Sequence, residues 1–160
     1  DFREAENHRG TLAIDINPLV DIPLPGQADT DLDGNNIPDA WEDLFYNELN
    51  SPRADQDNDG IPLLLEHALN TDPTKVDPHP LQLTRVPGGT LKLGFSRNRE
   101  LPFSRLVLET SPTLDDNSWL PVRAQAISIK PLDSLTDRLE VTIQPPDEVC
   151  FFRLRATVLQ

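Results

Sequence analysis

The sequence has no methionine, a single cysteine, one tyrosine and two tryptophans among its 160 residues. One cysteine, Cys150, excludes an internal disulfide. No apolar run approaches the roughly 18–20 residues that cross a bilayer, so we expect no membrane insertion. Because the chain starts at Asp1 and lacks methionine, we expect it to be a processed or excised piece of a longer protein.

Basic residues are also scarce: 14 Lys and Arg stand against 27 Asp and Glu, a net charge of −13. Without clustered bases, neither nucleic acid nor an anionic membrane surface is an expected partner. The excess lies in one half, because residues 1–80 hold 18 acids and 4 bases, whereas residues 81–160 hold 9 and 10. Apolar side chains such as Trp41 and Leu64 are interleaved with these acids, which argues against a disordered acidic tail.

The acidic region contains an internal repeat. Residues 31–42 read DLDGNNIPDAWE and residues 55–66 read DQDNDGIPLLLE, an offset of 24. The similarity continues in LNSPRAD (49–55) and LNTDPTKVD (69–77). Proline near the start and asparagine near the end predict that each acidic loop leads into a short helix, over residues 39–49 and 62–69.

Beyond residue 80 the apolar residues alternate with polar ones. This period of two predicts about six short strands, which contain residues 81–83, 91–95, 106–108, 127–129, 139–143 and 152–158. Pro87-Gly88-Gly89 and other turn signals separate them, as in a small antiparallel β-sandwich. The predicted fold class is therefore α+β, with two calcium loop–helix repeats followed by that sandwich.

The predicted domains follow from these patterns. Residues 1–28 are expected to be a linker with one strand over 11–17, which could be the tail of an upstream domain. Residues 29–78 would hold the repeats and residues 79–160 the β-sandwich.

Each acidic loop has the ligand spacing of a twelve-residue calcium loop. The predicted ligands in the first loop are Asp31, Asp33, Asn35, the Ile37 carbonyl, Asp39 and Glu42. Those in the second are Asp55, Asp57, Asp59, the Ile61 carbonyl and Glu66. Calcium takes six to eight oxygen ligands, which alternate side chains of a tight loop can supply. Helix capping would account for one or two acids per helix, but not for this spacing twice.

Three features depart from an ordinary EF-hand. No entering helix is predicted before either loop, and position 8 is Pro38 or Pro62, which has no N–H for a bridge between paired loops. At position 9 of the second loop Leu63 cannot coordinate, so water is expected there. Position 6 must turn with positive φ, which suits Gly60 and is tolerated by Asn36.

These loops resemble the bacterial thrombospondin type 3-like calcium repeat, over residues 29 to about 77. The segments GIPLLLEHALNTDP (60–73), LVLETSPTLDDNSWLPV (106–122) and FFRLRA (151–156) are similar to C-terminal modules of large exported bacterial proteins. The resemblance implies two structural calcium ions, a fibronectin- or immunoglobulin-like β domain, and a secreted or cell-surface location. Asn36 and Leu63 depart from the family pattern.

Other functions have weaker support in the sequence. No serine lies in a G-x-S-x-G turn, and the obvious carboxylate pairs belong to the loops, so an enzyme is not expected. The leading hypothesis is a non-enzymatic calcium-binding spacer whose partners are other domains of the parent protein or a surface partner. The alternative is a recognition module, either a dockerin-like protein binder or a sandwich that binds carbohydrate through Trp119. Arginines such as Arg153 and Arg155 are expected to be solvated, or else to dock against the acidic repeats.

Overall fold

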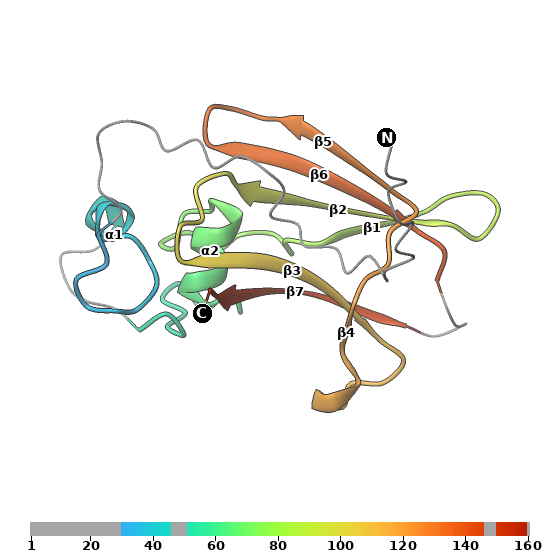
Figure 1. Cartoon of the computed structure of the whole chain (residues 1–160), viewed down its shortest axis with the longest axis horizontal. Helices are drawn as coiled ribbons and strands as arrows, with labels where there is room; N and C mark the ends of the chain where they lie inside the picture. The colour runs from blue at the N-terminus through green and yellow to red at the C-terminus, as the bar shows by residue number, and fades with distance from the viewer. Residues whose placement is uncertain (1–29, 46–50, 146–149, 160) are drawn as a thin grey trace, which may run out of the picture.

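A computed structural model of the chain describes residues 30–45, 51–145 and 150–159 (Figure 1). Its helices are α1 (Asp39–Phe45), α2 (Leu63–Leu69) and the 3-10 helix η1 (Asp116–Ser118). Its strands are β1 (Gln82–Arg85), β2 (Leu91–Asn98), β3 (Ser104–Ser111), β4 (Leu120–Pro121), β5 (Ala126–Pro131), β6 (Thr136–Ile143) and β7 (Phe151–Val158). The predicted strand over 11–17 lies outside the described residues.

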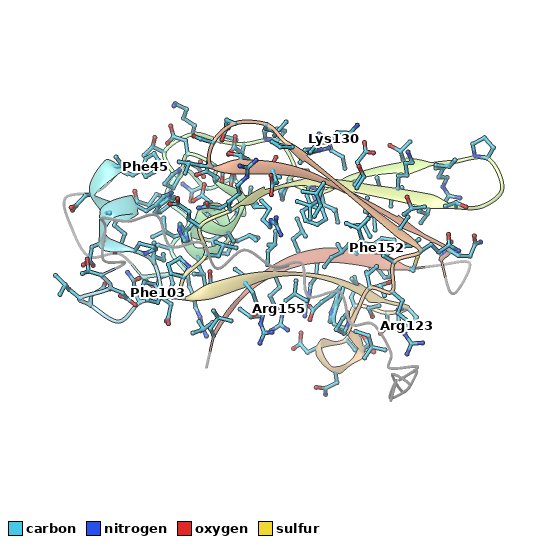
Figure 2. All side chains as sticks on the ribbon, turned by 45° about the horizontal axis from the view of Figure 1, so that its top comes forward. Phe45, Phe103, Arg123, Lys130, Phe152 and Arg155 are labelled. Atoms are coloured by element: carbon cyan, nitrogen blue, oxygen red, sulfur yellow. The ribbon has the colours of Figure 1, made fainter. Side chains whose placement is uncertain are left out.

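The strands form two antiparallel sheets, in the orders β1-β2-β6-β5 and β4-β3-β7. Because successive side chains of a strand point to opposite faces, every second side chain points into the space between the two sheets. Phe95 lies opposite Leu139 in one sheet, and Leu108 lies opposite Leu154 in the other. These side chains are buried, and Phe152 also lies between the sheets (Figure 2). The predicted α+β class with a sandwich-like β arrangement is therefore confirmed.

All six predicted strands are present. The turn at Pro87-Gly88-Gly89 joins β1 to β2, and both glycines have positive φ, of 94° and 83°. The strand that the pattern missed is β4, whose two residues are too few for a period of two to appear.

The two α-helices begin where the repeat predicts, within one residue. α1 starts at Asp39 and is described to Phe45, so its predicted extension to residue 49 lies outside the described residues. α2 starts at Leu63, immediately after Pro62, and ends at Asn70, which adopts the left-handed conformation with φ 59°. The Asn70 Nδ2 donates to Thr136 Oγ1 at 2.8 Å, which fixes the end of the helix to β6.

α2 packs against β2, β3 and β7 at one end of the sandwich, and α1 lies further out at that end (Figure 1). Ile61, Ala68 and Leu69 belong to the same buried cluster as the core of the two sheets. A second, smaller cluster joins Leu63 of α2 to Ile37 and Trp41. The predicted domain boundary, between residues 78 and 79, falls in the linking segment, residues 71–81. The hydrophobic core is shared by the elements on both sides of this segment. Within the described ranges, no helix is long and apolar enough to span a membrane.

Candidate metal centre

The two acidic loops, loop 1 (31–42) and loop 2 (55–66), have nearly the same backbone. In each, the N–H at position 9 donates to the carbonyl of the residue before position 1, from Asp39 to Thr30 at 2.9 Å and from Leu63 to Ala54 at 2.8 Å. The N–H at position 12 donates to the proline carbonyl at position 8, at 3.1 Å in loop 1 and 3.0 Å in loop 2. The sequence repeat is therefore a repeat of local structure.

Side chains make equivalent bonds in the two loops. The carboxylate at position 1 accepts from the N–H at position 6, at 2.9 Å in loop 1 and 3.0 Å in loop 2. The side-chain oxygen at position 5 accepts from the N–H at position 7 at 2.7 Å in both. These bonds turn the alternate side chains toward the inside of each loop.

Positive φ angles make this curvature possible. At position 6, Asn36 has φ 71° and Gly60 has φ 89°, as predicted for both loops. Position 4 is also left-handed, at Gly34 and Asn58, which the sequence analysis did not anticipate. Glycine and asparagine are the residues that tolerate this region best.

Loop 1 brings carboxylates together at positions 1, 3 and 9. Ligand oxygens of Asp31, Asp33 and Asp39 lie within 4.8 Å of one another. Glu42 is outside that group of three; its Oε1 accepts from the Asn35 Nδ2 at 2.8 Å. The same amide nitrogen donates to Asp33 Oδ2 at 2.9 Å, so Asn35 supplies loop 1 with an internal hydrogen-bond donor.

Four carboxylates of loop 2 and Asp77 from the linking segment come together in two overlapping groups. Ligand oxygens within 4.8 Å of one another belong to Asp55, Asp57 and Asp59, and also to Asp59, Glu66 and Asp77. Glu66 is 1% exposed, and its Oε1 has no hydrogen-bond partner among the described residues. Buried oxygens of Asp55, Asp57 and Asp77 lack partners in the same part of the structure. Buried anionic oxygens normally have partners, so this cluster has the chemistry of a cation site.

Electrostatics differ accordingly between the loops. Burial, reinforced by Asp57, Asp59, Asp77 and Asp55, raises the pKa of Glu66 from 4.5 to about 8. Burial also raises the pKa of Glu42, but the hydrogen bond from Asn35 opposes that rise. In loop 2 the repulsion among the acids favours protonation of Glu66. A bound positive charge would relieve that repulsion.

The predicted side-chain ligands all lie in the two loops, although Glu42 accepts from the Asn35 amide and is not grouped with Asp31, Asp33 and Asp39. The side chains of Ile37 and Ile61 are buried in the two hydrophobic clusters, and coordination by their carbonyls stays a prediction. Asp77 was missed. The alignment of LNTDPTKVD with LNSPRAD was the available signal, since it places Asp77 opposite Asp55.

His67 follows Glu66 but belongs to the packing. It is 2% exposed, lies edge-on to Trp41 with ring centroids 5.2 Å apart, and burial lowers its pKa to about 4. Its carbonyl accepts from the Asn98 Nδ2 at 3.0 Å, which ties α2 to β2.

Arg153 and Arg155 were expected to be solvated or to dock on the acidic repeats. In the structure they pair with a carboxylate of the sheets. Arg153 and Arg155 both bond the buried Glu109 at 2.8 Å. Figure 2 shows Arg155 on the outer side of the β4-β3-β7 sheet. The Arg153 guanidinium also lies 4.1 Å from the ring centre of Trp119, which leaves that face unavailable for a sugar. Asp137 similarly bonds two arginines, Arg97 at 2.7 Å and Arg99 at 2.8 Å.

No family model matches the chain, and no curated protein matches its sequence. The resemblance to thrombospondin type 3-like repeats therefore stays a prediction.

Proposed function

We propose that the chain is a non-enzymatic, calcium-stabilised spacer module, with one calcium ion in each loop. The observation that carries the proposal is the cluster of buried carboxylate oxygens in loop 2, which have no partner in the described part of the chain. A second loop with the same backbone bonds lies 24 residues earlier and also gathers acids. Helix capping alone would leave no reason for such a cluster.

The donor set favours calcium over other metals. The three candidate groups contain carboxylates and neither cysteine nor histidine, which disfavours zinc. Magnesium demands near-octahedral geometry and keeps several waters, whereas calcium accepts the irregular oxygen sets of curled loops. Two calcium ions would reduce the net charge from −13 to about −9 and act where repulsion is greatest.

The role would be structural, because α2 and Ile61 share the core of the sandwich. Neutralising the acids of loop 2 would relieve their repulsion and so stabilise the helix that covers one end of both sheets. Millimolar extracellular calcium suits sites of modest affinity, which favours a secreted or cell-surface location. The resemblance of the sequence to C-terminal modules of large exported bacterial proteins is why we place the module in the C-terminal part of such a protein. Its partners would be neighbouring domains of that protein or a surface partner.

Calorimetric melting tests this function. The full chain is melted in calcium, in magnesium and in excess chelator, beside an Asp33→Asn/Asp57→Asn variant that removes one ligand from each loop. At calcium a hundredfold above Kd, linkage adds about 2.7 kcal/mol to the stability for each occupied site. We expect a higher Tm in calcium for the original chain and a smaller rise for the variant. An unchanged Tm in calcium would refute the proposal.

A further inference from the structure

We propose that Asp77, which lies outside both loops, is a ligand of the calcium ion in loop 2, so that this ion also holds the linking segment in place. The inference rests on the proposed function and specifies the composition of its second site. The loop would then supply only part of the coordination shell, and the chain leading into β1 would supply the rest.

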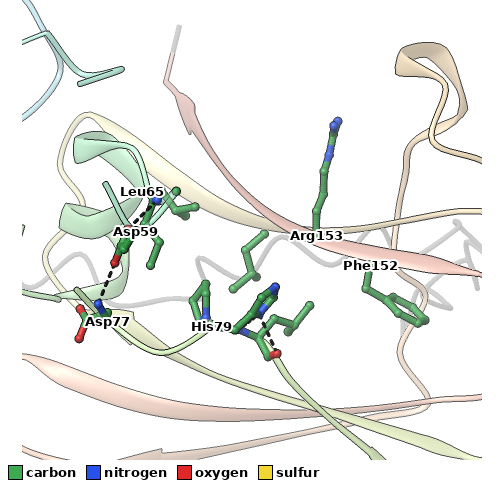
Figure 3. Close-up of a pocket in the computed structure, with 11 residues that line it drawn as sticks. Asp59, Leu65, Asp77, His79, Phe152 and Arg153 are labelled. Carbon is green, nitrogen blue, oxygen red and sulfur yellow. Dashed lines mark hydrogen bonds between the residues drawn. The ribbon is translucent and has the colours of Figure 1, made fainter. Parts of the chain in front are cut away.

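Asp77 lies close to two of the acids of loop 2. Ligand oxygens of Asp77, Asp59 and Glu66 lie within 4.8 Å of one another, although Asp77 is 18 residues from Asp59 along the chain. The Asp77 N–H donates to Asp59 Oδ2 at 2.9 Å, which fixes the backbone of the linking segment against loop 2 (Figure 3). A cavity of about 290 Å³ is lined by Asp59 and Asp77, so this side of the cluster faces a space large enough for an ion.

The described residues also leave carboxylate oxygens of this cluster without hydrogen-bond partners. Glu66 is 1% exposed, and neither its Oε1 nor Asp77 Oδ2 has a hydrogen-bond partner among the described residues. Among the described residues, Lys75 acts on Asp77 through its charge but bonds Asp72, and Arg153, which lines the same cavity, bonds Glu109. Unpartnered buried carboxylates are costly, and a bound cation would satisfy them.

The two loops also differ in the residue at position 9. Loop 1 has Asp39 there, grouped with Asp31 and Asp33. Loop 2 has Leu63, whose buried side chain joins Ile37 and Trp41 in the smaller hydrophobic cluster. Asp77 would thus add a fifth acid to a site that has none at position 9, where the sequence alone predicted a water, although it joins positions 5 and 12 and not positions 1 and 3.

The test isolates loop 2 in a background in which Asp31→Asn and Asp33→Asn disable loop 1. Calcium is titrated calorimetrically into this background, into background plus Asp77→Asn, and into background plus Asp72→Asn. Asp72 is the matched control, because it lies in the same segment and loses the same charge, but it bonds Thr74 and Lys75 and not the cluster. We expect Asp77→Asn to raise Kd by about tenfold or more, since ligand charge sets calcium affinity, and Asp72→Asn, whose charge acts on Asp77 without contact, to change it far less.

Hydrogen exchange gives a second readout that does not depend on affinity. At saturating calcium, amides of residues 71–81 should be protected in the background and in the Asp72→Asn protein, and less protected in the Asp77→Asn protein. In chelator, Asp77→Asn should melt no lower than the background, since it removes a repelled charge.

The outcomes separate the two proposals. If the background binds no calcium, the proposed function of loop 2 fails. If it binds and Asp77→Asn has the same Kd as Asp72→Asn, only the role of Asp77 fails. A lower Tm of Asp77→Asn in chelator would also overturn it, because Asp77 would then stabilise the fold without an ion.

Discussion

Loops 1 and 2 share a length, a backbone and a helix start, yet they balance their acids differently. Position 5 is Asn35 in loop 1, and its amide donates to Glu42. The same position is Asp59 in loop 2, where the Oε1 of Glu66 has no partner among the described residues. One amide therefore satisfies part of the first loop, although Asp39 Oδ2 lacks a partner in the described part of the chain, whereas more oxygens of the second loop lack one. Two loops with the same ligand spacing thus differ in how many of their acidic oxygens are satisfied, and under the proposed function they should differ in how much a calcium ion stabilises them.

Leu63→Ala should have the largest effect, and it tests whether position 9 of loop 2 is used for packing. Leu63 is 1% exposed, so truncation should cost about 2–5 kcal/mol of unfolding free energy, in calcium and in chelator alike. Denaturant titration under both conditions measures this. Leu44→Ala on α1, at a residue 74% exposed, is the control and should change little. A loss seen in calcium alone would mean that Leu63 acts through the metal site.

Glu66→Gln should change stability in opposite directions with and without calcium. In chelator at neutral pH it replaces a carboxyl that burial and its acidic neighbours force to hold a proton, and it should stabilise the fold by about 1–3 kcal/mol. In calcium it removes a ligand and should lower Tm. Glu42→Gln should show a smaller gain in chelator, because Asn35 already donates to Glu42. Equal gains for the two variants would remove the distinction between the loops.

The pH dependence of the calcium-free protein sharpens the same distinction. The folded-state pKa of Glu66, about 8, lies above its ordinary value of 4.5, so protonation favours folding. This contribution is fully present below pH 4.5 and is lost as the pH rises toward 8. His67, whose pKa is lowered to about 4, acts oppositely, since its contribution is lost as the pH falls from 6.5 to 4. Subtracting the Glu66→Gln profile from the original one isolates Glu66, and a flat difference between pH 4.5 and 8 would contradict the assignment.

Asn35→Asp should have the smallest effect and should make loop 1 resemble loop 2. Losing the donor to Glu42 should cost about 1 kcal/mol in chelator, while the added carboxylate should tighten calcium binding by loop 1. Calorimetric titration and melting measure the two effects. The control is Asn117→Asp, which adds the same charge at an exposed position of η1. Weaker calcium binding by Asn35→Asp would show that the amide oxygen is the better ligand.

Much of the fold could be predicted because its signals are local. Alternation of apolar residues identified every strand except β4, and proline and asparagine marked the helix ends. Spacing identified the loop acids, and steric preference identified Asn36 and Gly60 as turning residues. Each of these signals lies within about a dozen residues of the structure that it predicts.

The features that were missed depend on long-range contacts. Asp77 meets Asp59 across 18 residues, and Glu109 meets Arg153 across 44. No period or spacing encodes such contacts, because tertiary packing decides them. The sharing of one core by α2 and the sheets also depends on long-range contacts, since the alternation in β2 does not indicate which helix covers its end.

The bond from position 9 to the residue before each loop, from Asp39 to Thr30 and from Leu63 to Ala54, has a kinetic consequence. It closes each loop into a ring through backbone atoms alone. Ordering of the ring is therefore part of folding, and calcium binding as proposed would meet ligands that are already assembled. Association with calcium should then be limited by diffusion and dehydration of the ion, so differences in affinity between the loops should appear mainly in how fast the ion leaves.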